Sequence, residues 1–350
     1  MPALAVADAL RASGADVSFL GAEGRPEAEL VPAGGYEIDL LRVEGLDRSS
    51  PARAARAATL AGRAVPAARR ALRRRRADAV MGGGGYVAGP AGIAALSLRL
   101  PLVLTEADRH LGLANRLLAR RARRVCLAFP IPGLVGERYL VTGRPVPAAV
   151  GAADPAAARR RFRIAARDRC LLVFGGSQGA RSINEAALEA FAGPEPRHFH
   201  VLHVAGHRDY GFARDRLAAS DPDRYTLLAY EPTLADPLAA CDLVLARAGG
   251  SVFELAAAAK PAVLVPYPHA AAGHQHANAA WMADAGAAVV VEDSDLSPEL
   301  LRRIVSELLA DSGRLERMAA AARSLARPEA ADRIAQEILA AIEPHADGGG

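Results

Sequence analysis

The stretch CLLVFGGSQGARSINEAALEAF, residues 170–191, decides the fold of this chain. An apolar run ends in a turn that holds three glycines, and a stretch with helical spacing follows. A buried strand that turns directly into a helix is typical of parallel α/β sheets. Glycines let the backbone approach a ligand, and the N–H groups at the helix start attract anions. The stretch therefore predicts a parallel sheet with a phosphate site at the turn. The alternative is a plain turn, with Ser182 and Glu185 as a capping box.

The same alternation of apolar runs and Ala-rich helical stretches continues in both directions along the chain. We predict eleven strands, which is too many for one sheet of this type, and 350 residues are enough for two lobes. The predicted strands are 15–20, 78–83, 101–106, 123–129 and 138–143 in the first series, and 170–176, 200–206, 225–230, 242–248, 262–267 and 287–293 in the second.

Between the two series, the Pro- and Ala-rich segment 143–162 is predicted to be an interdomain linker that leads into a helix. We expect a first lobe over residues 1–145, completed by a C-terminal helix over 328–343 that packs back on it. The second lobe is expected over residues 146–327. The fold class is therefore α/β, with two doubly wound lobes facing a cleft and ligands bound at the carboxyl ends of the strands.

Composition excludes several classes of protein. Hydrophobic residues make up 51% and charged residues 23% of the chain, and no run of eighteen apolar residues occurs, so neither disorder nor a membrane span fits. The first sixteen residues have the pattern of an amphipathic helix and not of a signal peptide. Cys126, Cys170 and Cys241 lie in or beside apolar runs without C-x-x-C spacing, which predicts buried thiols in a reducing cytoplasm.

A second candidate ligand loop lies in the second lobe, in the stretch RAGGSVFEL at 247–255. Here Gly249 and Gly250 follow a predicted strand, and Glu254 lies one turn into the next helix, where a carboxylate can bind ribose hydroxyls. Ser251 and Glu254 also fit a capping box, and both roles are compatible. Downstream, three histidines with Gln275 and Asn278 surround a helix start. Because no carboxylate or cysteine joins them, we predict sugar hydroxyls and not a metal as their ligand.

In the first lobe, GGGGYVAGPAG at 82–92 gives the backbone freedom to approach a ligand. At the end of the next strand lie Thr105, Glu106 and Asp108, and a histidine follows them. Carboxylates beside a histidine are suited to acid–base chemistry, but a solvated loop with an Asx cap explains these residues equally well. Arginines cluster at 69–76, which predicts either contact with an anionic membrane surface or a solvated basic face. Nucleic acid is not expected as a partner, because few aromatic residues interleave these arginines.

Taken together, the segments GGGGYVAGPAG, GLANRLLA, AFP, GGSQGAR, RAGGS, PHAAAGHQHANA and DAGAA occur in the order found in the MurG family, which this chain resembles over nearly its whole length. The resemblance implies a GT-B fold and inverting transfer of N-acetylglucosamine from UDP to an undecaprenyl-pyrophosphoryl muramyl-pentapeptide, in peptidoglycan synthesis. It implies a cytoplasmic enzyme that is peripheral on the inner face of the cell membrane and needs no cofactor or metal.

The resemblance also implies roles for individual residues. On the UDP-sugar side, the diphosphate would contact the loop at 175–179, and the ribose would contact Glu254. The sugar would contact His274 and Gln275, and the uracil would contact the backbone near Tyr230. The full predicted UDP-sugar site comprises Gly175, Gly176, Ser177, Gln178, Gly179, Tyr230, Gly249, Gly250, Ser251, Glu254, His274, Gln275 and Asn278. The predicted acceptor side comprises Gly84, Gly85, Tyr86, Thr105, Asp108 and Asn115, with Glu106 as the catalytic residue.

Three segments depart from the family pattern. The family begins with a strand and a glycine loop that contains a candidate catalytic histidine, whereas this sequence starts at Met1-Pro2-Ala3. We therefore expect the first lobe to lack its first strand and Met1 to be an internal methionine of a longer natural chain. TEAD at 105–108 replaces His-Glu-Gln-Asn, and GRPVP at 143–147 replaces Gly-Asn-Pro-Val-Arg. The alternatives are a related transferase with another acceptor and a UDP-sugar-binding protein without activity.

Overall fold

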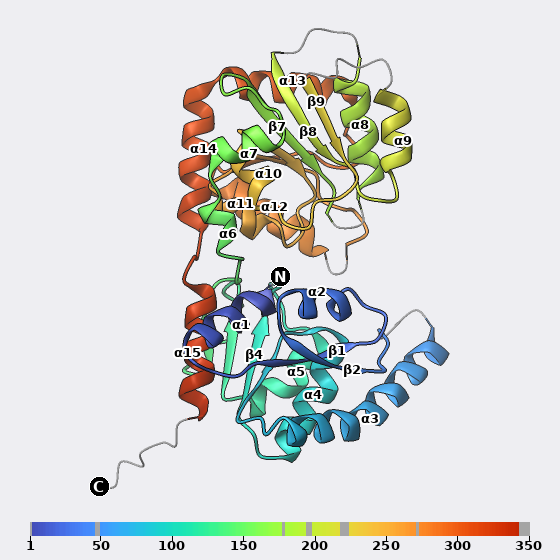
Figure 1. The fold of residues 1–350 in the computed structure, drawn as a ribbon, viewed down its shortest axis with the longest axis vertical. Coiled ribbons are helices and arrows are strands. Elements are labelled where there is room, and N and C mark those ends of the chain that lie inside the picture. Colours follow the sequence, from blue (N-terminus) through green and yellow to red (C-terminus); the bar gives the residue numbers. More distant parts are fainter. Residues whose placement is uncertain are drawn as a thin grey trace, which may run out of the picture. The chain divides into compact units, whose positions relative to one another are not determined.

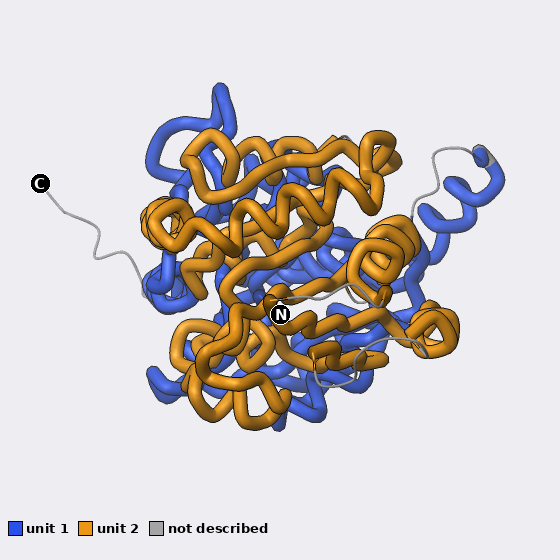
Figure 2. Tube along the Cα trace, turned by 90° about the horizontal axis from the view of Figure 1, so that it is seen from above, with its two compact units in different colours: residues 1–147, 327–350 blue, residues 148–326 orange. Residues whose placement is uncertain are grey.

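The chain folds into two compact units, shown in different colours in Figure 2. Unit 1 comprises residues 1–147 and 327–350, and unit 2 comprises residues 148–326. Every strand pair in both units is parallel, so the predicted α/β class is confirmed. The computed structural model describes residues 2–45, 50–176, 179–193, 198–217, 224–270 and 273–342.

Unit 2 is built on a six-stranded sheet with the order β12-β11-β10-β7-β8-β9. Figure 1 labels β7, β8 and β9 of this sheet. The strand order runs outward from the centre in both directions, so β7 and β10 are neighbours at the point where the order reverses. At such a switch point the loops after the two strands diverge and leave a crevice at the carboxyl ends of the strands. The strands are β7 (Arg169–Phe174), β8 (Phe199–Val204), β9 (Tyr225–Leu228), β10 (Leu243–Ala246), β11 (Ala262–Leu264) and β12 (Ala288–Val290).

Helices cover both faces of this sheet. Leu171, Val173 and Leu245 pack on one face against α8 and α13 in a fully buried cluster. Successive side chains of a strand point to opposite faces, so Leu172 and Val244, which are also fully buried, belong to the other face. The helices of unit 2 are α6 (Ala149–Ala152), α7 (Pro155–Arg161), α8 (Arg181–Phe191), α9 (Tyr210–Arg216), α10 (Ala235–Ala240), α11 (Val252–Ala257), α12 (His274–Asp284), α13 (Pro298–Ala310) and α14 (Ser312–Leu325).

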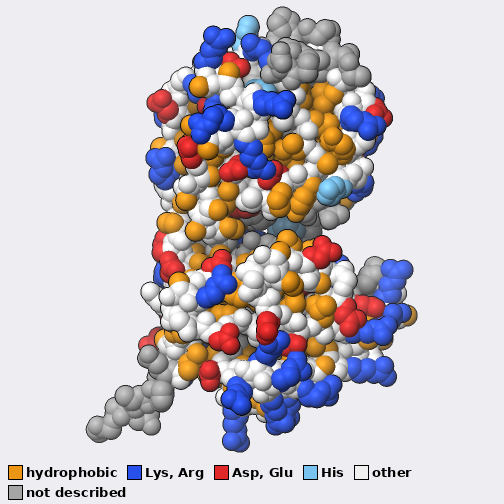
Figure 3. Space-filling view, viewed as in Figure 1, with side chains coloured by type: hydrophobic (Ala, Val, Ile, Leu, Met, Phe, Trp, Pro, Cys, Tyr) orange, Lys and Arg blue, Asp and Glu red, His pale blue; other side chains and the backbone are white. Residues whose placement is uncertain are grey.

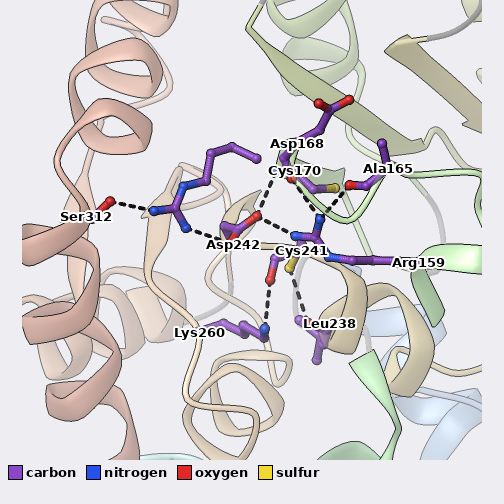
Figure 4. Close-up of polar contacts among 10 residues, drawn as sticks. Arg159, Ala165, Asp168, Cys170, Leu238, Cys241, Asp242, Lys260 and Ser312 are labelled. Atoms are coloured by element: carbon purple, nitrogen blue, oxygen red, sulfur yellow. Dashed lines mark hydrogen bonds and ion pairs between the residues drawn. The ribbon is translucent and has the colours of Figure 1, made fainter. Parts of the chain in front are cut away.

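The amino end of the same sheet is fixed by a network around Asp242, which precedes β10 (Figure 4). Its carboxylate accepts hydrogen bonds from Arg159 Nη2 at 2.8 Å, Arg169 Nη1 at 3.1 Å and the backbone N of Cys170 at 2.8 Å. Lys260 Nζ donates to the Cys241 carbonyl at 2.7 Å. These contacts join β7, β10 and the helices beside them, so this end of the sheet is occupied by the protein's own side chains.

All three cysteines are buried and free, as predicted. Desolvation by burial raises the pKa of Cys126 to about 12 and that of Cys241 to about 11. These thiols are therefore neutral at physiological pH, which makes them poor nucleophiles.

Unit 1 contains two separate parallel sheets, β1-β2 and β3-β4-β5-β6. Among the described residues no strand joins them, and β1 and β3 both line a cavity of about 1050 Å³. The open edges of the two sheets therefore line the same cavity. The strands are β1 (Ser18–Ala22), β2 (Glu37–Leu41), β3 (Val80–Gly82), β4 (Leu102–Glu106), β5 (Arg124–Leu127) and β6 (Tyr139–Val141).

Two helical layers enclose the four-stranded sheet of unit 1. On one face, α3 and α4 pack with β4 and β5 in a buried cluster that includes Leu72 and Leu104. On the other, Val6 of α1 and Ile334 of α15 pack against Val103 of β4. None of the described helices is both long and apolar enough to cross a membrane. The helices of unit 1 are α1 (Pro2–Ala12), α2 (Glu27–Ala33), α3 (Pro51–Arg74), α4 (Gly85–Ser97), α5 (Leu113–Leu118) and α15 (Ala330–Ile342), with the 3-10 helix η1 (Ala119–Arg121).

The sequence-based prediction of the fold missed one strand. Strand β2 was not predicted; its sequence, EIDLL, alternates charged and apolar residues, and it pairs on one side only, with β1. A short strand at the edge of a sheet leaves a weak hydrophobic signal. The segment predicted as a linker that leads into a helix, 143–162, spans the boundary between the two units and contains α6 and α7, which belong to unit 2. The second of these helices starts at Pro155, after the cap Asp154.

Candidate functional site

The glycine turn after β7 has a conformation that only glycine allows at two positions. A Cβ atom at Gly175 would collide with the backbone N of Ala180, so the turn folds back closely on itself. Gly179 has φ +75, and a Cβ atom there would lie 2.6 Å from the carbonyl oxygen of Ala205. The turn leads into α8, whose N-cap, Ala180, provides no side-chain hydrogen bond. The first N–H groups of this helix therefore form an anion-binding end. Predicted residues Ser177 and Gln178 lie outside the described residues.

The two predicted capping boxes are not formed. Ser182 is the second residue of α8 and donates its Oγ hydrogen bond to Asp293 Oδ1 at 2.7 Å, while Glu185 pairs with Arg181. Ser251 is the residue before α11, but it has helical angles and makes no capping hydrogen bond. A capping side chain requires an extended backbone at the N-cap, which sequence spacing alone does not reveal.

The loop after β10 is held by the start of α12. Asn278 is buried, and its Nδ2 donates to the carbonyl oxygens of Ala248 at 3.0 Å and Gly249 at 3.5 Å. Gln275 Oε1 accepts a hydrogen bond from the Tyr267 backbone N at 2.9 Å. The structure thus brings the predicted residues Gly249 and Asn278 together at the loop after β10, which continues through Gly250 and Ser251 to Glu254, while Gln275 contacts the segment after β11. Helix α12 begins at His274, after Gly273 in the left-handed conformation.

Tyr230, the predicted uracil-side residue, forms an aromatic pair with His207 beyond the ends of β9 and β8. The ring centroids are 5.1 Å apart at 23°, which is a stacked arrangement, and Tyr230 is partly exposed. His207 lies two residues after Ala205, whose carbonyl contacts the glycine turn. A flat, partly exposed aromatic surface beside an anion-binding helix end is suited to a ligand that has both a ring and phosphates.

A buried polar chain that the sequence did not predict connects α8 with β8. Asn184 Nδ2 donates to the Ala205 carbonyl at 2.9 Å and to Asp209 Oδ2 at 3.0 Å, and Asn184 Oδ1 lies 3.0 Å from His203 Nε2. His203 Nδ1 lies 2.8 Å from the Tyr225 hydroxyl. Complete burial lowers the pKa of His203 to about 3, so the ring is neutral at physiological pH. The chain fixes the first turn of α8 against the neighbouring strand.

In unit 1, the predicted catalytic residue Glu106 anchors the loop that follows β4. Its carboxylate accepts four hydrogen bonds, from the backbone N of Ala107 at 3.0 Å, Asp108 at 3.2 Å and Gly112 at 2.8 Å, and from Asn115 Nδ2 at 2.9 Å. Asn115 Nδ2 also donates to the Thr105 carbonyl. The structure thus brings Thr105, Glu106, Asp108 and Asn115 together in one network, in which the Glu106 carboxylate orders the loop.

The glycine run of unit 1 lies beside the neighbouring strand. Thr105 Oγ1 contacts the Gly82 carbonyl at 3.5 Å, so the ends of β3 and β4 are adjacent. Gly84 and Gly85 both have positive φ and form the turn into α4. Tyr86 follows them and is 50% exposed, with the Arg25 guanidinium 5.6 Å from its ring centre.

The comparisons with known proteins agree with this architecture. Residues 1–127 match the glycosyltransferase family 28 N-terminal domain, and residues 170–334 match the family's C-terminal domain. A UDP-N-acetylglucosamine–N-acetylmuramyl-(pentapeptide) pyrophosphoryl-undecaprenol N-acetylglucosamine transferase from Halorhodospira halophila is 41% identical over 95% of this chain and 92% of its own length. A protein of the same name from Moorella thermoacetica is 40% identical over 98% of this chain and 95% of its own length.

Solved structures give the same result. The crystal structure of Acinetobacter baumannii MurG superposes with a TM-score of 0.75 and 30% identity, over 97% of this chain and 95% of that chain. A UDP-N-acetylglucosamine 2-epimerase from Neisseria meningitidis, at 14% identity and a TM-score of 0.68 over 97% of this chain and 96% of its own, shares the fold alone. The predicted GT-B fold is confirmed, and the chain belongs to the MurG family of glycosyltransferases.

Proposed function

We propose that this protein transfers N-acetylglucosamine from UDP-N-acetylglucosamine to N-acetylmuramyl-(pentapeptide) pyrophosphoryl-undecaprenol, with inversion at the sugar carbon. Family membership supports the reaction, because the named relatives cover nearly the whole chain. The observation that carries the proposal is the pair of glycine loops after β7 and β10, which flank the switch point of the unit 2 sheet. Ligands of doubly wound sheets bind at this position.

On the donor side, we assign the diphosphate to the loop at 175–179 and the first N–H groups of α8. Negative charge builds up on the departing UDP during transfer, and fixed backbone N–H groups stabilise it. Glu254 binds the ribose in this proposal, and His274 and Gln275 bind the sugar. The backbone near Tyr230 binds the uracil, and the Tyr230–His207 pair provides the adjacent flat surface.

On the acceptor side, we assign Thr105, Asp108 and Asn115, together with Gly84, Gly85 and Tyr86. Glu106 contributes to catalysis by holding the loop over residues 107–112, because all four of its hydrogen bonds go to this loop and to Asn115. A carboxylate in which each oxygen accepts two hydrogen bonds is suited to positioning neighbouring groups.

We propose that unit 1 also contacts an anionic membrane surface at the cytoplasmic face. Exposed apolar residues lie on α4, on α5 and on the loop after β5: Ile93, Leu113, Leu117, which is 71% exposed, and Val135, which is 81% exposed. Exposed arginines flank Leu117, and others line α3, where Figure 3 shows basic side chains gathered. Each basic residue near such a surface contributes about 1 kcal/mol of attraction. Apolar side chains within a basic rim fit a lipid headgroup layer better than a nucleic acid.

The test is transfer of labelled N-acetylglucosamine from UDP-N-acetylglucosamine to the lipid-linked muramyl-pentapeptide, combined with calorimetric titration of the donor. Donor binding with steady turnover supports the proposal. Donor binding without turnover on this acceptor, but with turnover on another lipid or small-molecule hydroxyl, shows a different acceptor. Binding without any turnover shows a UDP-sugar-binding protein, and no donor binding overturns the proposal.

A further inference from the structure

Arg247 lies at the centre of a network at the carboxyl end of the unit 2 sheet, directly after β10. Its Nη1 donates to Asp293 Oδ1 at 2.6 Å and to the carbonyl oxygens of Val265 and Pro266, both at 3.2 Å. Its Nη2 donates to Ser182 Oγ at 2.8 Å. The side chain is only 11% exposed. A largely covered guanidinium that is paired with a carboxylate and bound by further acceptors holds a single geometry.

The partners of Arg247 come from both sides of its strand. In the sheet order β12-β11-β10-β7, Ser182 is in the first turn of α8 after β7, and Val265 and Pro266 follow β11. Asp293 follows β12. Ser182 closes the network, because its own Oγ donates to Asp293 Oδ1 at 2.7 Å. One side chain therefore connects the ends of four neighbouring strands.

This network links the two glycine loops. Ser182 lies three residues after Gly179, and Arg247 lies two residues before Gly249. The distance between the start of α8 and the loop after β10 thus depends on the bonds between Ser182, Arg247 and Asp293. A site that binds two linked phosphates requires this distance to be fixed before the ligand arrives.

We infer that Arg247, with Ser182 and Asp293, is a positioning residue that holds the two glycine loops at the spacing a nucleoside diphosphate requires, and is not itself a phosphate ligand. The inference rests on the proposed function for the identity of the ligand. Two observations distinguish positioning from direct binding: both hydrogens of Nη1 are engaged by protein acceptors, and Asp293 neutralises the charge.

The two roles predict opposite signs for Asp293→Asn. If Arg247 positions the loops, loss of the carboxylate weakens the network, and the KM for UDP-N-acetylglucosamine rises on the order of 10-fold, the equivalent of one charge-assisted hydrogen bond. If Arg247 is a phosphate ligand restrained by Asp293, the substitution frees a cation, and the same KM falls. Positioning also predicts that Ser182→Ala raises this KM by about 3-fold, as for one neutral hydrogen bond.

The experiment measures kcat and the KM of both substrates for Asp293→Asn, Ser182→Ala and Arg247→Lys. Positioning predicts that the donor KM rises in all three variants while the acceptor KM is unchanged. It also predicts that the effects of Asp293→Asn and Ser182→Ala on the donor KM are not additive when the two substitutions are combined. The matched control is Arg159→Lys, which weakens the Arg159–Asp242 pair at the opposite end of the same sheet. It is expected to lower the melting temperature without changing the donor KM.

A second readout separates failure of this inference from failure of the proposed function. If the wild-type protein does not bind UDP-N-acetylglucosamine, the proposed function is overturned, and amide hydrogen exchange of the free protein then decides the inference. Faster exchange in both 179–184 and 247–252 of Asp293→Asn or Ser182→Ala supports the positioning role. A fall in the donor KM of Asp293→Asn, or unchanged donor KM and unchanged exchange in both variants, overturns it.

Discussion

Substitution of Gly179 by alanine tests the glycine turn most sharply, because the structure contains a matched control. Gly176 has φ +88 and Gly179 has φ +75, so alanine is strained by the backbone at either position, at a cost of about 1 kcal/mol. The surroundings differ. Among the described residues, a Cβ atom at Gly176 would meet nothing within 4 Å, whereas a Cβ atom at Gly179 would lie 2.6 Å from the Ala205 carbonyl oxygen.

The contact at Gly179 must be relieved by a movement of the turn or of β8. An ordinary contact between these atoms needs several tenths of an ångström more, and forcing extra volume into packed structure costs a further ~1–3 kcal/mol. We expect Gly179→Ala to lower stability by about 3 kcal/mol in total, which corresponds to about 6–12 °C in melting temperature. Gly176→Ala is expected to lower it by about 2–4 °C.

The assay is a thermal melt of both variants, followed by titration with UDP-N-acetylglucosamine. Because the shifted turn leads into α8, Gly179→Ala is also expected to weaken donor binding by at least about 10-fold, the equivalent of about 1.4 kcal/mol. Equal melting temperatures and equal affinities in the two variants would refute the argument, since the steric term would then be absent.

Three further predictions concern other parts of the molecule. Glu106→Gln replaces one acceptor oxygen by a donor, so two of the four hydrogen bonds are lost; hydrogen exchange in 107–112 speeds up and turnover falls at least ~10-fold. Asp108→Asn is the control variant, and we expect it to retain slow hydrogen exchange in the loop. Equal hydrogen exchange in the two variants would contradict the anchoring role of Glu106. His203 has a folded pKa of about 3, below its value in the unfolded chain, so protonation favours unfolding as pH falls below about 6.5. The free energy of unfolding of the wild type, measured by chemical denaturation, therefore falls by up to about 2 kcal/mol between pH 6.5 and pH 5. His203→Gln should lose less over the same range, and parallel pH profiles of the two proteins would contradict the prediction. Leu117→Ser lowers sedimentation with anionic liposomes, whereas Leu40→Ser, at an exposed position on β2, does not; equal sedimentation would dismiss this surface as a membrane contact.

Much of the fold was readable from the sequence because parallel sheets leave a strong local signal. All eleven predicted strands overlap observed ones, since each contains a short apolar run, and the central strands β4, β7, β8 and β10 are buried on both faces. Strand β2 escaped prediction because only its last residue, Leu41, is buried, and its two charged residues, Glu37 and Asp39, form ion pairs with Arg75. Hydrophobic periodicity reports burial, and an edge strand buries too little.

The candidate site was readable in part. The two glycine loops were found because glycine spacing after a strand is local in the sequence. The network of Ser182, Arg247 and Asp293 was not found, because its members lie 46 to 111 residues apart and meet only once the strand order is known. The same applies to the bond between Asn184 and His203. The capping boxes failed for a related reason: spacing fixes which residues can cap, while the backbone angles decide whether they do.

The central claim is that unit 2 binds the two phosphates of UDP-N-acetylglucosamine between the start of α8 and the loop after β10. Hydrogen exchange of the wild-type protein, with and without UDP-N-acetylglucosamine, tests it directly. The claim predicts slower exchange in 175–184 and in 247–254 at the same ligand concentration, with the amino end of the sheet around Asp242 unchanged. Protection of only one loop, or of neither, would contradict it.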